Sequence, residues 1–472
     1  MLPSPPEQRQ STQPVSLSTR IQSLDVLRGI AVLAALFVSI WIFGGFSDNQ
    51  QKQLLITSKG WNYRVFGAVD LLLNGKMRAM IAIVFGAAMV LFLSKETEPG
   101  KQPAGDIFIK RQLWLIIFGL VNAVLLLWTN DLLFHLGVLG ILLFPFFRIN
   151  SRGLLIAALF TTLVYCGKNY WSYSDQQSAY RKYVAVTALE KKFEQDSITK
   201  AKTGLVAKKD TLKTMQKRDK EAWLGILAGK KINPKADDPT NKAMRSGSYG
   251  KVWNFLLPKS QARQADWTYK LGVWDLACMM FLGMLLYKIG FFNSRFSNRR
   301  YLIVAFVAVA GGLLLGWYRL NFEQISLRDY EKFVKTHSIP NDLFFPIERA
   351  AIALAYVSLT MALLSTRILA PIWSGLAAVG KLALTNYLVQ TIICTIFFYG
   401  YGMGYFGRLS QFQLYFFAAE VVLVQIAFSV LWLRAYNYGP AEWLLRRLSA
   451  GKWLPKRFRK PSDTEPVIPV LS

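Results

Sequence analysis

Two closely spaced pairs of ionisable residues fall within or beside apolar stretches, where side chains able to do chemistry stand out. Asp131 and His135 are four residues apart, so a helix would carry both on one face. There the carboxylate can orient the imidazole, as a general base or a proton relay requires. The alternative interpretation is an aspartate that compensates a helix dipole beside an interfacial histidine.

Asp25 and Arg28 form the second pair, three residues apart at the start of an apolar segment. This spacing predicts an ion pair on one helix face, and Ser39 lies three turns further along that face. Arg28 is a candidate contact for an anionic substrate or donor. A helix cap together with an arginine that reaches the membrane interface is the alternative.

Several uncharged or acidic polar residues interrupt later apolar stretches. Thr385, Asn386 and Gln390 lie in one of these stretches, and they predict either substrate contacts or hydrogen bonds between helices. Glu420 lies well inside another, where an ionisable group is costly in lipid. We expect its carboxyl group to be protonated, paired or facing water. Five residues at helix ends would form an acidic vestibule if they converge: Asp70, Asp131, Asp275, Glu348 and Arg349.

The elements that must position these residues are membrane-spanning helices. Of the 472 residues, 53% are hydrophobic and only 18% are charged, and the apolar ones come in blocks of about 20, long enough to cross a bilayer. The sequence therefore predicts an all-α, polytopic transmembrane helix bundle of about ten spans. The expected spans are Val26–Phe46, Met77–Leu93, Leu113–Trp128, Leu132–Phe147, Leu154–Cys166, Leu271–Ile289, Leu302–Trp317, Ile347–Leu364, Leu382–Phe398 and Leu414–Leu433.

The same pattern divides the chain into five parts. We expect a disordered cytoplasmic tail (1–20), a first membrane half (21–167), an extracytoplasmic lysine-rich helical insert (168–270), a second membrane half (271–433) and a basic cytoplasmic tail (434–472). Lysine and arginine concentrate in alternate short loops, which places both termini in the cytoplasm. The insert holds 22 Lys or Arg against 10 Asp or Glu, but long loops cross the membrane largely regardless of charge.

Net charge and cysteine content restrict the expected binding partners and the expected roles of the cysteines. In a membrane protein a net charge of +28 reflects basic loops that meet anionic lipid headgroups, so we expect membrane lipids and no nucleic acid as partners. Cys166, Cys278 and Cys394 all lie in apolar stretches, which favours small buried side chains over disulfides or a metal site. The sequence leaves the oligomeric state open.

Five stretches carry a resemblance to a known family. They are Arg20–Ala31 (RIQSLDVLRGIA), Lys76–Gly86, Asp131–Pro145, Leu384–Gln390 with Phe398–Gly404, and Tyr438–Trp443 (YGPAEW). In order and spacing the chain resembles the bacterial domain-of-unknown-function family 418, over nearly its whole length outside the insert. The first helix of that family is similar to those of transmembrane acyltransferases, which include acyltransferase family 3 and the lysosomal heparan-glucosaminide acetyltransferase.

The resemblance implies acyl transfer from a cytoplasmic donor, acetyl- or acyl-coenzyme A, to an acceptor across the membrane. It also implies that Arg28 meets a donor phosphate and that His135, oriented by Asp131, is the base. Two departures stand against a simple transfer of mechanism. Ser39 occupies the position of the catalytic histidine of acyltransferase family 3, and no histidine lies between Asp48 and Leu73, where the lysosomal enzyme has one.

Three functions follow from these observations. The first is an acyltransferase-like protein of the bacterial inner membrane that modifies an envelope glycan or lipid. The second is a transporter of a small solute or lipid-linked substrate, supported by the five-plus-five division of spans and by polar residues inside them: Asn122, Gln390 and Glu420. The third is a non-catalytic scaffold that docks partners on the insert. A cavity at the Asp25–Arg28 entrance favours the first, and broken helices favour the second.

Overall fold

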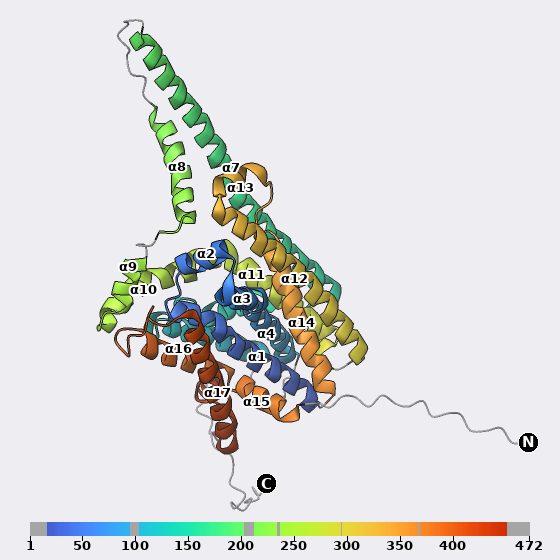
Figure 1. The fold of residues 1–472 in the computed structure, drawn as a ribbon. Helices are drawn as coiled ribbons and strands as arrows, with labels where there is room; N and C mark the ends of the chain where they lie inside the picture. The colour runs from blue at the N-terminus through green and yellow to red at the C-terminus, as the bar shows by residue number, and fades with distance from the viewer. Residues whose placement is uncertain are drawn as a thin grey trace, which may run out of the picture.

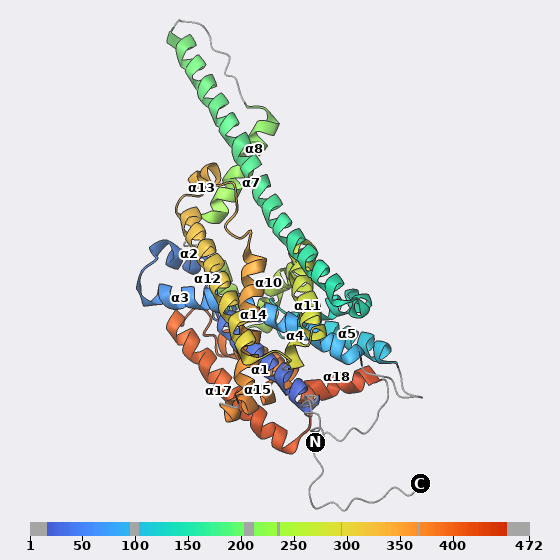
Figure 2. The same cartoon turned by 90° about the vertical axis from the view of Figure 1, so that its right-hand side faces the viewer.

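The protein is described by a computed structural model, which covers residues 17–94, 103–202, 212–233, 237–293, 295–366 and 369–450. Over these residues the chain is helical and contains no strand, which confirms the all-α prediction (Figure 1). Residues 1–16 of the expected amino-terminal tail and residues 451–472 lie outside the described residues. The long helices pack into a bundle, and one helical hairpin projects far beyond it (Figures 1 and 2).

The elements of the first half are α1 (Leu17–Phe43), α2 (Asp48–Thr57), α3 (Gly60–Leu72), α4 (Lys76–Leu93), α5 (Ala104–Leu120), the π-helix η1 (Val121–Leu125), α6 (Leu133–Leu142), the 3₁₀-helix η2 (Phe144–Arg148), α7 (Ser151–Lys202) and α8 (Thr214–Lys230). The second half has α9 (Asp238–Met244), α10 (Tyr249–Ala262), the π-helix η4 (Arg263–Gly272), α11 (Val273–Lys288), the 3₁₀-helix η5 (Phe291–Asn293), α12 (Asn298–Arg328), α13 (Tyr330–Thr336), α14 (Phe345–Ser365), α15 (Ala370–Lys381), α16 (Ala383–Phe398), α17 (Gln411–Ala435) and α18 (Pro440–Ala450).

Every expected span falls on a helix, but fewer than ten of these helices can cross a membrane alone. Among the described residues, seven helical stretches are long and apolar enough, or up to eight if the bent pair α15 and α16 counts as one. The expected span Leu132–Phe147 is only a ten-residue helix, α6, which reaches about half of a ~30 Å hydrocarbon core. The expected span Leu154–Cys166 is the first part of the 52-residue helix α7.

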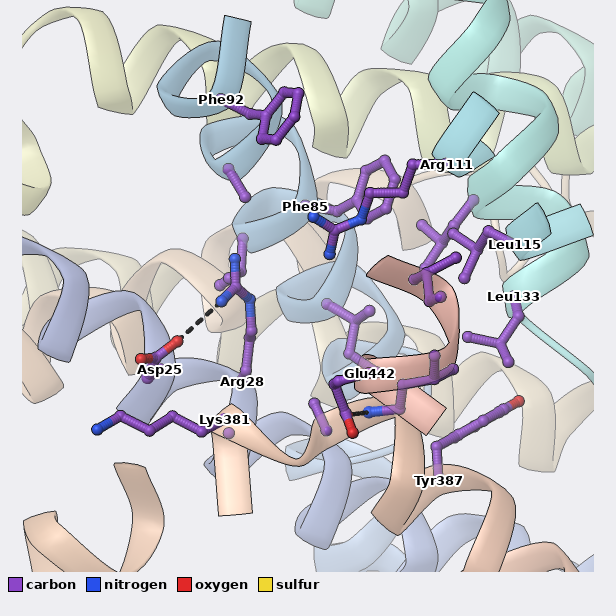
Figure 3. A pocket seen from close by; sticks show the side chains of 18 of the residues that line it. Asp25, Arg28, Phe85, Phe92, Arg111, Leu115, Leu133, Lys381, Tyr387 and Glu442 are labelled. Atoms are coloured by element: carbon purple, nitrogen blue, oxygen red, sulfur yellow. Dashed lines mark hydrogen bonds and ion pairs between the residues drawn. The ribbon is translucent and has the colours of Figure 1, made fainter. Parts of the chain in front are cut away.

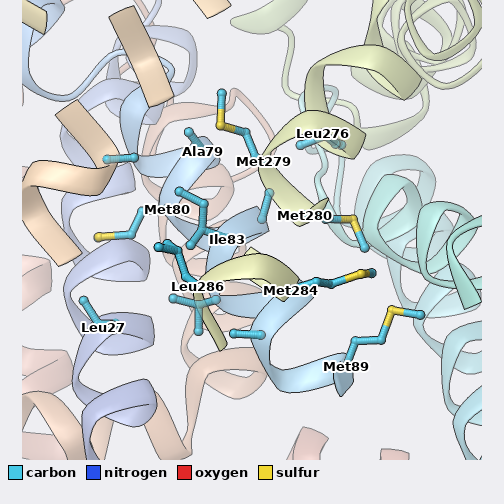
Figure 4. Packing of buried hydrophobic residues seen from close by; sticks show 14 of the residues in the cluster. Leu27, Ala79, Met80, Ile83, Met89, Leu276, Met279, Met280, Met284 and Leu286 are labelled. Carbon is cyan, nitrogen blue, oxygen red and sulfur yellow. The ribbon is translucent and has the colours of Figure 1, made fainter. Parts of the chain in front are cut away.

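The centre of the bundle is apolar and rich in methionine. Met80 of α4 and Met279, Met280 and Met284 of α11 are almost completely buried there (Figure 4). The backbones of α4 and α11 touch, since a side chain on Gly86 would come within 2.1 Å of the Met280 carbonyl oxygen. Glycine at such crossings lets membrane helices approach closely enough for extensive packing.

A second close crossing joins α1 to α15 and prepares the candidate site. A Cβ atom on Gly29 would lie 2.1 Å from the Leu376 carbonyl oxygen, and one on Gly380 would lie 1.7 Å from that of Asp25. This contact fixes Lys381 beside the beginning of α1. The chain then bends by 80° between α15 and α16, so α16 starts beside the same end of α1.

The lysine-rich insert forms the projecting hairpin and the segment that returns to the bundle. Helix α7 runs without a break past residue 168, and α8 returns beside it (Figure 2). Near its base Trp223 of α8 is fully buried and stacks on Tyr330 of α13, at 5.9 Å between ring centroids. We call the end of the bundle nearest this hairpin the hairpin end, and the opposite end, where α1 begins and α18 lies, the terminal end.

Three of the four acidic groups expected to form a vestibule, Asp70, Asp275 and Glu348, instead lie in buried ion pairs at the hairpin end. Lys76 binds Glu348 at 2.5 Å and donates to the Asp70 carbonyl oxygen at 2.9 Å. Arg319 bridges Glu348 at 2.8 Å and Asp70 at 2.5 Å. Glu323 completes this group at 3.5 Å from Arg319.

Asp275 lies in a second buried group, where Arg349 and Arg78 are its partners. The vestibule prediction is therefore wrong for Asp70, Asp275 and Glu348, because Arg349 and three cations outside that prediction neutralise their carboxylates: Lys76, Arg78 and Arg319. Isolated charges would be prohibitively costly in an apolar bundle, and pairing is the usual solution.

Candidate functional site

A cavity of about 530 Å³ opens at the terminal end of the bundle. Its walls come from α1, α4, α5, α6, the α15–α16 junction and α18, so segments distant in sequence build it together (Figure 3). This volume lies within the range of small-molecule sites, about 300–1,000 Å³. The cavity is therefore large enough for a ligand rather than a few water molecules.

Basic side chains surround the cavity opening. Arg28, Arg111, Lys381 and Arg446 all line it, against two acidic residues, Asp25 and Glu442, which leaves an excess of two positive charges. Lys381 and Arg446 are exposed, while Arg28 and Arg111 are half-buried. Such an excess in a partly desolvated recess attracts anions, and guanidinium groups bind phosphate or carboxylate especially well.

The predicted Asp25–Arg28 pair is present at this opening. The Arg28 guanidinium donates to the Asp25 carboxylate at 2.8 Å, across one helical turn of α1 (Figure 3). The Asp25 side chain is 7% exposed, whereas that of Arg28 is 35% exposed and reaches the cavity. Asp25 thus holds the Arg28 guanidinium in position, and the rest of the guanidinium stays accessible to a ligand in the cavity.

Glu442 closes one side of the opening and ties α18 to α16. Its carboxylate accepts hydrogen bonds from the backbone N–H groups of Leu384 (2.6 Å) and Thr385 (3.0 Å) and from the Thr385 hydroxyl (2.5 Å). Glu442 also lies in the first turn of its own helix, which begins at Pro440. Burial raises the pKa of this carboxyl group, and the three hydrogen bonds oppose that effect.

The inner part of the cavity is apolar. Leu115, Leu132, Leu133 and Leu136 line it and are at most 9% exposed. Tyr387 of α16 adds a polar edge, because its hydroxyl accepts from the backbone N–H of Leu132 at 3.0 Å. The cavity therefore changes from cationic at the opening to apolar inside, which suits an amphiphilic anion.

The predicted Asp131–His135 pair is not formed. Helix α6 begins at Leu133, so Asp131 precedes it and the spacing of four does not place both side chains on one face. The Asp131 carboxylate instead accepts from Asn122 at 2.8 Å and from the Phe134 N–H at 2.9 Å. The His135 ring packs edge-on against Trp267, 5.0 Å away.

The remaining predicted residues lie outside the cavity lining. Asn386 donates to Ser429 at 2.9 Å, and Gln390 donates to Gln425 at 2.8 Å, so both join α16 to α17. Thr385 holds Glu442 and touches the site only through it. Ser39 is half-buried in α1, and Glu420 is exposed on the outer face of α17.

Three of the four cations at the opening were not predicted as site residues: Arg111, Lys381 and Arg446. Basic residues entered the sequence argument only as a guide to membrane sidedness. Lys381 ends α15, whereas Arg111 and Arg446 lie inside α5 and α18. They share no local sequence signal, and their position beside the Asp25–Arg28 pair becomes visible only when the helices are packed.

The fold and cavity define a class: a polytopic α-helical membrane protein with a cationic, apolar-lined recess at one end. Residues 286–452 match the family described as "Protein of unknown function (DUF418)", the family that the sequence resemblance named. This segment includes α15 to α18, hence Lys381, Glu442 and Arg446 of the opening.

Relatives extend the similarity to nearly the whole chain. The chain is 26% identical to "Uncharacterized protein YeiB" of Escherichia coli over 90% of its own length and 95% of the relative's. It is also 26% identical to "Uncharacterized protein YxaH" of Bacillus subtilis, over 94% and 98% of the two lengths. No solved structure matches the chain.

Proposed function

We propose that the chain is an acyltransferase-like membrane protein whose cavity binds an acyl-coenzyme A donor. The observation that carries the proposal is the change from a cationic opening to an apolar interior. The nucleotide phosphates of the donor would meet Arg28, Arg111, Lys381 and Arg446, and the acyl chain would occupy the leucine-lined interior. The charged and apolar parts of the donor each find matching surroundings in this arrangement.

The proposal includes sidedness. The terminal end carries the beginning of α1 and the basic helix α18, and basic loops favour the cytoplasmic side of a bacterial inner membrane. A cytoplasmic donor would then enter directly. The acyl group would pass from the thioester sulfur to a hydroxyl or amine of an envelope glycan or lipid, and the acceptor's proton would go to the sulfur of the departing coenzyme A, which leaves as the free thiol. A role for His135 and Asp131 in that transfer stays a prediction, and His135 takes no part in the proposed donor site.

Donor binding tests the proposal. The full chain in lipid nanodiscs is titrated with acetyl-coenzyme A by calorimetry, for the wild type, Arg111→Ala and the matched control Lys110→Ala. Lys110 is adjacent in sequence, exposed and absent from the cavity lining. We expect saturable binding that Arg111→Ala weakens about tenfold or more, from the loss of a charge-assisted contact. Absence of binding by the wild type, or equal weakening by both variants, overturns the proposal.

A transporter is the second candidate, because one helix is broken beside the cavity. The 80° bend separates α15 from α16 where Lys381, Ala383 and Leu384 line the recess. Discontinuous helices beside a substrate site occur in secondary transporters. A cysteine at Leu133, inside the cavity, discriminates between the two functions. A transporter exposes it to membrane-impermeant thiol reagents from alternate sides of the membrane, whereas a donor site exposes it from the terminal end alone.

A further inference from the structure

Helix α17 lies at the edge of the bundle (Figure 1). Only 22% of the residues in its most apolar stretch are buried, against 56% in the corresponding stretches of α1 and α14. In a membrane protein a peripheral helix usually presents only apolar residues to lipid. The outer face of α17 departs from this pattern at Glu420, near the middle of the helix.

Part of the exposed face of α17 follows a heptad repeat. Gln413, Glu420, Ala427 and Arg434 are spaced by seven, and all are exposed. Phe416 and Leu423, which are 61% and 66% exposed, occupy the intervening positions as far as Ala427. We call these six residues the α17 seam; other exposed residues, among them Val424 and Leu431, lie beside it. Alternating steps of three and four, as between Gln413 and Ala427, are the pattern of a helix that packs along another helix in a left-handed crossing.

The chemistry of the seam specifies its partner. A carboxyl group in the middle of a span needs a hydrogen-bonding partner at the same depth, and the apolar neighbours Phe416 and Leu423 supply none. Two copies of the chain inserted alike run parallel, and a two-fold axis along the membrane normal brings equivalent residues together at equal depth. A carboxylic acid group offers both a donor and an acceptor, so two such groups that face each other at equal depth in lipid complement each other.

We propose that the protein forms a homodimer in the membrane through the α17 seam, with the two Glu420 side chains hydrogen-bonded across the two-fold axis. Ala427, one heptad further, permits close approach of the two helices, as small residues do at such interfaces. A single polar seam position also fixes register, because a shifted pairing leaves both carboxyl groups among apolar side chains. This interface is separate from the cavity and does not depend on the proposed function.

Disulfide cross-linking in native membranes tests the seam. Leu423→Cys and the control Leu314→Cys on α12 are compared in a Cys166→Ser background; the two leucines are 66% and 64% exposed. Mild oxidation should link Leu423→Cys to its own copy and yield a covalent dimer, while Leu314→Cys stays monomeric. Equal dimer yields at both positions, or a Leu423→Cys product of a different mass, would overturn the proposal.

Substitution of Glu420 gives an independent test. Photobleaching of the labelled chain in lipid vesicles counts copies per particle for the wild type, Glu420→Gln and Glu420→Leu. The glutamine keeps a donor and an acceptor, so it should dimerise as the wild type does. The leucine should raise the dissociation constant roughly tenfold. Since leucine suits a lipid-facing position, a folded Glu420→Leu chain that dimerises like the wild type contradicts the proposal.

Discussion

The two ends of the bundle use charge in opposite ways. At the hairpin end Lys76, Arg319, Asp70 and Glu348 are buried and paired with one another. At the terminal end four cations surround a cavity that offers only two carboxylates, and two of these cations are exposed. Paired buried charges have no capacity left for a ligand, whereas surplus accessible charges attract one. The first group therefore fixes the fold, and the second is the candidate for function.

The largest effect should follow from breaking a pair at the hairpin end. Lys76→Met leaves Glu348 without its 2.5 Å partner in a fully buried site. Removing one member of such a pair costs about 3–5 kcal/mol. We expect a loss of that order in the free energy of unfolding, measured by titration with a denaturing detergent.

The double variant Lys76→Met with Glu348→Leu sharpens this prediction. Replacing both members removes the carboxylate that lost Lys76 and then relies on Arg319 alone, so part of the lost stability should return, although Arg319 keeps only Asp70 and Glu323. If the double variant is less stable than Lys76→Met by a full further increment, the two residues are not coupled and the structural interpretation of this end is wrong.

The second effect concerns binding rather than stability. Arg28→Ala, at the terminal end, should weaken binding of acetyl-coenzyme A by about tenfold to a hundredfold, the scale of a charge-assisted contact. Its free energy of unfolding should fall by less than that of Lys76→Met, because Arg28 is 35% exposed and water can partly replace it beside Asp25, whereas both members of the Lys76–Glu348 pair are buried. Calorimetry and the same denaturing titration measure the two quantities. A large loss of stability with unchanged binding would contradict the prediction, because Arg28 would then stabilise the fold as the hairpin-end charges do and would not bind the donor.

The third effect concerns Glu442, a carboxylate that both lines the cavity and stabilises the fold. Glu442 lines the cavity, yet three hydrogen bonds commit it to the start of α16. Glu442→Ala should destabilise the protein by about 1–2 kcal/mol, as the loss of a helix cap does. Glu442→Gln keeps an acceptor oxygen and should lose less. If both variants instead bind the donor more tightly at unchanged stability, Glu442 acts by repelling anions and not as a cap.

Sequence patterns predicted the structural features that depend only on residues close together in the chain. Apolar length predicted the helices, and a spacing of three predicted the Asp25–Arg28 ion pair, because both lie within one turn of α1. The same reasoning failed for Asp131 and His135, because a spacing of four pairs side chains only inside a helix and α6 begins at Leu133. Helix boundaries are the least certain part of such an inference.

Convergence of distant segments was beyond sequence reasoning. Arg111, Lys381 and Arg446 come from three helices, and only the crossing of Gly29 with Gly380 and the docking of α18 bring them to one opening. Lys76 and Glu348 are likewise 272 residues apart. Nothing in local spacing specifies such pairs, since they depend on how whole helices pack.

The smallest effect should come from the polar contacts between α16 and α17. Gln390 donates to Gln425, and Gln425 donates to the backbone carbonyl oxygen of Asn386 at 2.9 Å. Like the ion pairs at the hairpin end, these groups are buried and hydrogen-bonded to one another, but they carry no charge. Hydrogen bonds between membrane helices contribute about 0.6 kcal/mol on average. A double-mutant cycle with Gln390→Leu and Gln425→Leu should therefore give a coupling near that value, and donor binding should stay within about twofold of the wild type. A tenfold loss of binding would instead move these residues into the site and support the substrate contacts that the sequence left open.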